Sequence, residues 1–146
     1  MSRRVLFGCA VAVVAVAVVP VGAHHAAQAQ FDLTKTIVLE GKCVKMEWIN
    51  PHSYLHLSVS DANGAATTWQ LETVGPTALR RAGLSRGDNS IKCDPLGGGG
   101  TYVVRGFPAR NGRTVGLIAD LKLHDGRMVK LLDVKEFQLP EGFEAK

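Results

Sequence analysis

The chain has 146 residues, with 17 Lys and Arg against 13 Asp and Glu, which gives a formal net charge of +4. This length suits one domain, and a hydrophobic share of 46% excludes disorder over most of the chain. Arg3 and Arg4 precede an apolar leader, and the rest of the chain carries 15 basic against 13 acidic residues. This balance argues against a nucleic-acid-binding protein, which would carry a basic stripe or patch.

Residues 1–23 have the anatomy of a secretory signal peptide. Two arginines form the charged start, an uncharged run from Val5 to Val19 follows, and small residues precede a cleavage site after Ala23. A second cleavage site after Ala29 also fits the sequence. Because the apolar run is shorter than the roughly 20 residues that span a bilayer, we expect export without a stable membrane anchor. The expected location is the periplasm, an oxidising compartment.

Two cysteines, Cys43 and Cys93, remain once the leader with Cys9 is removed. An even number of cysteines in an exported protein predicts a disulfide. Such a bond would close a long loop, and chain-entropy arguments give it a stabilising effect of roughly 3–4 kcal/mol. Two buried free thiols are the alternative interpretation, because the sequence does not place the two Cβ atoms within bonding reach.

The mature chain divides into three parts by composition. Residues 24–35 are small and polar and form the expected N-terminal arm, 36–137 form the predicted barrel domain, and 138–146 form a polar C-terminal tail. Apolar residues at strand spacing and turn signals define the elements of the domain. In chain order we expect strands over 36–48, 53–60 and 67–74, a short helix over 75–82, strands over 102–107 and 115–123, and a sixth candidate strand over 128–134.

Two irregularities are predicted within this series. The apolar face of the first strand changes sides near Gly41, which predicts a bulge or a sharp coil there. The segment 85–100 contains Pro95 and four consecutive glycines. Glycines bury no side chain and lose the most entropy on ordering, so we expect an exposed, mobile loop.

Three strands, a short helix and then two or three strands define an all-β chain. This order predicts a small OB-like Greek-key barrel of five to six strands with one short helix between strands 3 and 4. A small open sandwich is the alternative architecture. OB barrels bind many kinds of ligand, so the fold alone does not fix the function.

Several short motifs resemble those of a family of small exported bacterial proteins classed only as a domain of unknown function. The most specific are a His-His pair after the expected cleavage site (His24, His25) and a Trp-x-Asn-Pro-His motif that ends at His52. The others are Phe31-Asp32, Lys35, Leu39-Glu40-Gly41, Trp69, Glu72, Leu79-Arg80-Arg81-Ala82-Gly83, Gly87-Asp88, Gly106-Phe107-Pro108-Ala109 and Asn111-Gly112.

The resemblance covers nearly all of the mature chain. It implies an exported all-β domain and implies no activity. The sequence departs from the family pattern between Gly87-Asp88 and Gly106, where the segment with Cys93 and the four glycines lengthens the chain. The local loop geometry is therefore the part that the resemblance does not cover.

The histidines suggest one metal hypothesis. Cleavage after Ala23 would leave His24 with a free α-amino group and an imidazole, a nitrogen pair that suits Cu(II). A copper site would then use His24 with His25 or His52 as the next ligand. His52 and His56 lie about 13 Å apart on an extended strand and cannot share one ion. The plain alternative is that His52 bonds backbone in a turn, and cleavage after Ala29 would remove both N-terminal histidines.

The sequence contains no complete catalytic motif. It has no Gly-x-Ser-x-Gly elbow, and its cysteines lack Cys-x-x-Cys spacing. We therefore expect a non-enzymatic periplasmic binding or accessory module, with an unknown small ligand or periplasmic protein as partner and no nucleic acid. The second hypothesis is a copper protein with redox chemistry. The expected binding groove is lined by Trp48, His52, Tyr54, His56 and Trp69.

Overall fold

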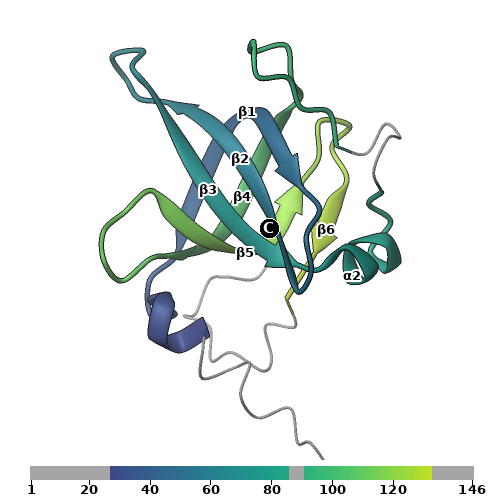
Figure 1. Cartoon of the computed structure of the whole chain (residues 1–146). Coiled ribbons are helices and arrows are strands. Elements are labelled where there is room, and N and C mark those ends of the chain that lie inside the picture. The colour runs from purple at the N-terminus through teal and green to yellow at the C-terminus, as the bar shows by residue number, and fades with distance from the viewer. Residues whose placement is uncertain (1–26, 86–90, 133–146) are drawn as a thin grey trace, which may run out of the picture.

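The computed structural model describes residues 27–85 and 91–132. The predicted leader, His24, His25 and the C-terminal tail lie outside the described residues. The strands are β1 (Ile37–Glu47), β2 (His52–Ser60), β3 (Ala66–Val74), β4 (Thr101–Pro108), β5 (Val115–Lys122) and β6 (Met128–Lys130), and the helix between β3 and β4 is α2 (Pro76–Arg81) (Figure 1).

The six strands form one sheet in the order β3-β2-β1-β4-β5-β6. A parallel pairing of β3 with β5 closes the first five strands into a barrel, and β6 adds an antiparallel strand to β5. Figure 1 shows α2 across one end of this barrel. The OB-like prediction is confirmed, because closure joins the strands that the order alone would leave as edges.

The apolar side chains of β1 switch from one face of the strand to the other after Gly41, at a bulge. Cys43 pairs with Leu57 while Lys45 pairs with His56, so the extra residue of the bulge lies between Cys43 and Lys45. The predicted position of the bulge, near Gly41, is therefore wrong by a few residues. Gly41 has a different role, because β1 and β2 approach each other closely there. A Cβ at Gly41 would lie 2.6 Å from the backbone oxygen of Ser58, so the glycine serves strand packing instead of a bulge.

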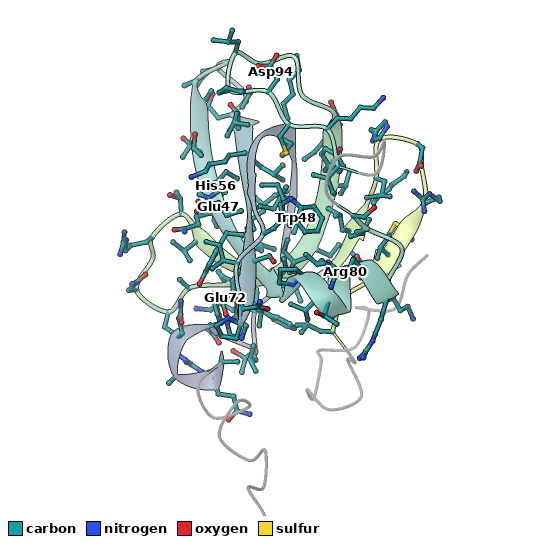
Figure 2. All side chains as sticks on the ribbon, turned by 45° about the vertical axis from the view of Figure 1, so that its right-hand side comes forward. Glu47, Trp48, His56, Glu72, Arg80 and Asp94 are labelled. Atoms are coloured by element: carbon teal, nitrogen blue, oxygen red, sulfur yellow. A yellow bond between two sulfur atoms is a disulfide. The ribbon has the colours of Figure 1, made fainter. Side chains whose placement is uncertain are left out.

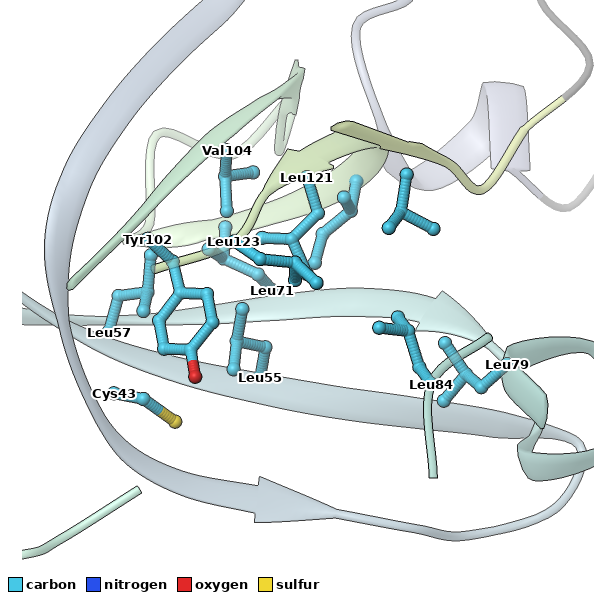
Figure 3. Close-up of a cluster of buried hydrophobic side chains, with 12 residues drawn as sticks. Cys43, Leu55, Leu57, Leu71, Leu79, Leu84, Tyr102, Val104, Leu121 and Leu123 are labelled. Atoms are coloured by element: carbon cyan, nitrogen blue, oxygen red, sulfur yellow. The ribbon is translucent and has the colours of Figure 1, made fainter. Parts of the chain in front are cut away.

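The barrel interior is filled mainly by alternating residues of neighbouring strands. Leu55 and Leu57 of β2, Leu71 of β3 and Tyr102 of β4 are at most 1% exposed and belong to one cluster (Figure 3). Burying a leucine side chain contributes about 1.5–3 kcal/mol, so this cluster is a main source of stability. Because side chains alternate along a strand, the same pattern sends the even-numbered residues of β2 to the outer surface.

The polar segment before β1 also contributes to the core. Phe31 is 1% exposed and forms an isolated bridge with Ala109, and it packs in a second cluster with Leu33, Phe107 and Leu117. The small and polar composition of residues 24–35 predicts an arm and gives no sign of this packing. In the structure residues 27–33 lie against β4 and β5.

The predicted disulfide is confirmed between Cys43 and Cys93, whose Cα atoms are 4.6 Å apart. The glycine segment is exposed in part, as expected, with Leu96 93% exposed, but some of its glycines also lie close to neighbouring atoms. A Cβ at Gly99 would lie 2.0 Å from the Cys43 oxygen, and one at Gly100 would lie 3.0 Å from the Tyr102 hydroxyl. Gly99 is therefore needed where the disulfide-linked segment lies close to the backbone of β1, and Gly100 leaves room for the Tyr102 side chain of β4.

Candidate functional site

The strands β1, β2 and β3 place a polar cluster on the outside of the barrel. Ser53, Leu55 and Leu57 of β2 are buried, so the residues between them face outward. Cross-strand register then sets one residue of β1 and one of β3 beside Tyr54. We call this cluster the His–Glu face, and it consists of Lys45, Glu47, His52, Tyr54, His56 and Glu72.

Glu47 and His56 form the first pair of the His–Glu face. The Nε2 atom of His56 lies 2.7 Å from Oε1 of Glu47, and Nζ of Lys45 lies 2.9 Å from the same oxygen. Figure 2 shows the labelled His56 and Glu47 side by side. The hydrogen bond from Lys45 and, next, the one from His56 lower the pKa of Glu47 below its ordinary value. Glu47 is therefore an ionised carboxylate with a permanent cation beside it.

His52 and Glu72 form the second pair, between β2 and β3. Nδ1 of His52 lies 2.6 Å from Oε1 of Glu72, and the Glu72 side chain is 12% exposed while that of His52 is 51% exposed. Within 27–85 and 91–132, the structure pairs no Lys or Arg with Glu72. The carboxylate thus lies mostly out of water and depends for its charge balance on an imidazole, which is charged only when protonated.

Tyr54 lies between the two pairs, opposite Glu47 on one side and Glu72 on the other. Burial raises the pKa of Tyr54 above its ordinary value, and the negative charges of Glu72 and then Glu47 raise it further. The phenol is therefore neutral at physiological pH and keeps its hydroxyl proton. Its ring also offers an apolar face to a ligand that reaches both carboxylates.

The balance of donors and acceptors on the His–Glu face favours cationic ligands. With both imidazoles neutral, the face carries two carboxylates against one Lys. A neutral imidazole that donates one ring N–H keeps its other nitrogen as an acceptor, and each carboxylate has several acceptor sites. The face therefore has acceptors to spare, and it suits ligands that bring positive charge and N–H donors.

Only part of the predicted groove comes together. His52, Tyr54 and His56 share the His–Glu face, whereas Trp48 and Trp69 pack against the main core cluster. Trp69 pairs with the buried Leu57, so it faces the barrel interior, where a large aromatic side chain buries more apolar area. The structure does not bring the two tryptophans onto this face.

The two glutamates of the face were not among the predicted site residues. Glu72 has the opposite parity to Trp69 on β3, and Glu47 directly precedes the Trp-x-Asn-Pro-His motif. The position of Glu72 on the opposite face of β3 from Trp69 could have indicated from the sequence that it faces outward. The pairing across strands, which turns isolated acids into His–carboxylate pairs, depends on register and on the bulge in β1.

The described residues contain no group of three or more His, Cys, Asp or Glu side chains placed to hold a metal ion. His52 and His56 bond to different glutamates. His124 lies in a different place, with Nδ1 3.4 Å from the Tyr102 hydroxyl. Any metal site that uses His52 would therefore need ligands from outside the described part of the chain.

Comparison with protein families gives a match over most of the chain. Residues 10–119 match a protein family that is described as a family of unknown function, DUF6152. No curated protein matches, and no solved structure matches. Over the two described ranges, no helix has the length and apolar character needed to cross a membrane.

Proposed function

The chain belongs to the DUF6152 family, and because that family has no established function, we propose one from the His–Glu face: an exported, periplasmic, non-enzymatic binding module for an organic cation. The ligand carries an ammonium or guanidinium group, either as a small molecule or as a side chain of a periplasmic protein. Its cation lies beside Glu72 and Tyr54, where acceptors are in excess.

The observation that carries this proposal is the position of Glu72. Its carboxylate is mostly buried, and its partner in the structure is His52 at 2.6 Å. Burying a charge is costly unless it is paired, so a cationic ligand gains from a site that is already desolvated and negative. The Tyr54 ring adds a surface on which a cation can be held, with a contribution of about 0.5–1 kcal/mol at an exposed site.

The position of the face in the fold supports the same function. OB barrels take their ligands on the outer face of the second and third strands, and the His–Glu face lies there. Fold analogy supports this place for the site and leaves the chemistry open. The chemistry of the proposal comes from the side chains of β1, β2 and β3 alone.

Export is supported by the leader sequence and by the disulfide, which fits an oxidising compartment. The structure also bears on the cleavage site. Residues 27–30 form a helical turn, and Ala27 packs against the cluster around Phe31. Cleavage after Ala29 would remove part of this turn, whereas cleavage after Ala23 would leave it whole, which supports a mature start at His24 in this proposal.

A titration with L-arginine amide tests the function. The protein from residue 24 to the C-terminus, with its disulfide formed, is followed by amide nuclear magnetic resonance as the probe is added. We expect saturable, weak binding with shifts at 52–54 and 70–72. The Glu72→Gln variant should lose the binding, and the matched variant Glu40→Gln, which neutralises an exposed carboxylate of β1, should keep it. Binding that is unchanged in Glu72→Gln would contradict the proposal.

Copper binding is the second candidate, and one observation favours it. A histidine that ligates a metal usually donates its other ring N–H to a carboxylate, and Nδ1 of His52 is held in this way by Glu72. Nε2 would then be the ligand atom, joined by the amine and ring of His24, with His25 as the alternative partner.

A copper titration separates this candidate from the first. One extra residue before His24 moves the free amine away and should weaken binding sharply. Glu72→Gln should weaken it by about 10–100-fold, the usual effect of losing such a carboxylate partner. Equal affinity in all three proteins would exclude this site.

A further inference from the structure

In the described part of the chain, each carboxylate of the His–Glu face is contacted through a single oxygen. Nδ1 of His52 lies 2.6 Å from Oε1 of Glu72. At Glu47, Nζ of Lys45 and Nε2 of His56 both lie against Oε1, at 2.9 and 2.7 Å. No donor from 27–85 or 91–132 is placed on the Oε2 atom of either glutamate. Each acid therefore presents one oxygen to a ligand.

The Oε2 atom of Glu72 can be reached from outside. Over the described ranges, the fully buried side-chain oxygens that lack a hydrogen-bond partner are those of Ser53 and Thr73. Oε2 of Glu72 is not one of them, although the Glu72 side chain is only 12% exposed. This oxygen is therefore an acceptor that has lost much of its water and still has room for a donor.

The ring of His52 supplies a second acceptor at the same end of the face. Two acceptor atoms 2.6 Å apart would repel each other, so a proton lies between Nδ1 of His52 and Oε1 of Glu72. In the neutral ring Nε2 is then an acceptor, and the His52 side chain is 51% exposed. The Glu72 end of the face thus offers separate acceptor atoms, one on the acid and one on the imidazole.

An acid of the same barrel shows what a guanidinium group requires instead. At Asp120, Nε of Arg105 donates to Oδ1 at 2.8 Å and to Oδ2 at 3.0 Å, and Nη2 also contacts Oδ2. This planar fork uses both oxygens of one carboxylate. At Glu72 a guanidinium would have to share Oε1 with the imidazole of His52. An ammonium group can direct each of its N–H bonds at a separate acceptor.

We propose that the His–Glu face selects primary alkylammonium groups over guanidinium groups, because His52 leaves one oxygen of Glu72 for the ligand. His52 is then the residue that sets the specificity, and it acts by covering Oε1. The inference rests on the proposed function, which it narrows from organic cations in general to one class. L-arginine amide carries both kinds of group, and its α-ammonium group is the one expected at Glu72.

Three probes of equal chain length test this selection: butylammonium, butylguanidinium and butyltrimethylammonium. Each carries one positive charge at about pH 8, where an ordinary imidazole is neutral. Binding is followed by the amide shifts at 52–54 and 70–72, in the same protein as the L-arginine amide titration. We expect butylammonium to bind about five-fold more tightly than butylguanidinium, the effect of one net hydrogen bond. The trimethyl probe has no N–H and should bind most weakly.

A pair of histidine variants tests the role of His52. His52→Ala uncovers Oε1 of Glu72, so the preference for butylammonium should vanish or reverse in favour of butylguanidinium. The matched variant His124→Ala removes an imidazole that lies outside the face, beside Tyr102, and should keep the preference. The amide spectrum of each variant without a probe confirms that it is folded.

The outcomes separate this inference from the proposed function. Equal affinities for the ammonium and guanidinium probes, or a preference that persists in His52→Ala, would overturn the selection while cation binding stands. Tightest binding of the trimethyl probe would mean that charge and the Tyr54 ring alone hold the cation, and it would overturn the selection as well. No binding of any probe would remove the proposed function and the selection with it.

Discussion

Two mostly buried carboxylates of the barrel have different kinds of charge partner. Asp120 of β5 is 4% exposed, and Nε of Arg105 donates to both of its oxygens at 2.8 and 3.0 Å, with Nη2 in contact as well. Glu72 of β3 is 9% exposed, and its partner is the imidazole of His52. One acid has a permanent, forked cation, and the other has a partner that is charged only when protonated.

This difference separates a structural pair from a responsive one. The hydrogen bonds that Arg105 donates to Asp120 raise the pKa of Arg105 above its already high ordinary value, so the guanidinium stays charged at physiological pH. The Glu72 pair retains capacity for a second donor. The proposed function places a cationic ligand at Glu72, whereas both oxygens of Asp120 already accept hydrogen bonds from Arg105.

The largest expected effect concerns the scaffold beneath both pairs. Replacing Cys43 and Cys93 by alanine removes a cross-link between residues 50 apart in sequence, which should lower the free energy of unfolding by about 4 kcal/mol. Urea unfolding measures the loss. In the folded variant, the amide nuclear magnetic resonance signals of both carboxylate pairs should stay unchanged, because neither pair includes the cysteines. A loss below about 1 kcal/mol would show that the bond does not restrain the unfolded chain.

The comparison itself is tested by a matched pair of neutral variants. Asp120→Asn leaves Arg105 without its charge partner and should cost about 3 kcal/mol of stability. Glu72→Gln keeps an acceptor for His52 and removes a mostly buried charge that has no Lys or Arg partner among the described residues, so it should cost less than about 1 kcal/mol. Urea unfolding near neutral pH gives both values. Equal losses would show that the two acids have the same structural role.

Acid should weaken the contribution of Glu47 in a defined range. Hydrogen bonds from Lys45 and His56 lower the pKa of Glu47 in the folded protein. The stabilising effect of Glu47 is therefore complete at a pH above its pKa in the unfolded chain, and it is lost as the pH falls through its pKa in the folded protein. The difference in unfolding free energy between the wild type and Glu47→Gln should therefore shrink below about pH 4.5. A difference that is constant down to pH 3 would contradict the assigned contacts.

The smallest effect is expected at alkaline pH. Burial and the charges of Glu72 and Glu47 raise the pKa of Tyr54 in the folded protein. The stabilising effect of its neutral phenol is therefore complete below about pH 10 and is lost as the pH rises through the pKa of Tyr54 in the folded protein. Ultraviolet titration of the wild type minus Tyr54→Phe isolates this tyrosine from Tyr102. Glu72→Gln should move its pKa down toward the ordinary value. An unchanged titration would place the phenol away from Glu72.

The sequence carries most of the fold and less of the site. Alternation of apolar residues locates the first five strands to within a residue or two, whereas the sixth, predicted over 128–134, ends at Lys130. The bulge at Cys43–Lys45 is displaced from the prediction, since Gly41 is required by the close approach of Ser58, which is a tertiary contact. The role of Phe31 in the second cluster is missed for the same reason.

Site prediction is limited by cross-strand register. The parity of β2 correctly groups His52, Tyr54 and His56, which depends on one strand alone. Pairing Glu72 with His52 depends on how β3 aligns with β2, and a shift of one residue would turn Glu72 inward. Aromatic residues suit both a binding surface and a core, and in the structure both tryptophans are partly buried and pack against the main core cluster.

The most direct test of the account is the effect of L-arginine amide on stability. The free energy of unfolding is measured near neutral pH, at constant ionic strength, for the protein from residue 24 to the C-terminus and for its Glu72→Gln and Asp120→Asn variants. At a probe concentration about tenfold above Kd, the parent and Asp120→Asn should each gain about 1.4 kcal/mol, and Glu72→Gln should gain nothing. An equal gain in all three, or a loss of the gain only in Asp120→Asn, would contradict the assignment of Glu72 as the cation-binding carboxylate.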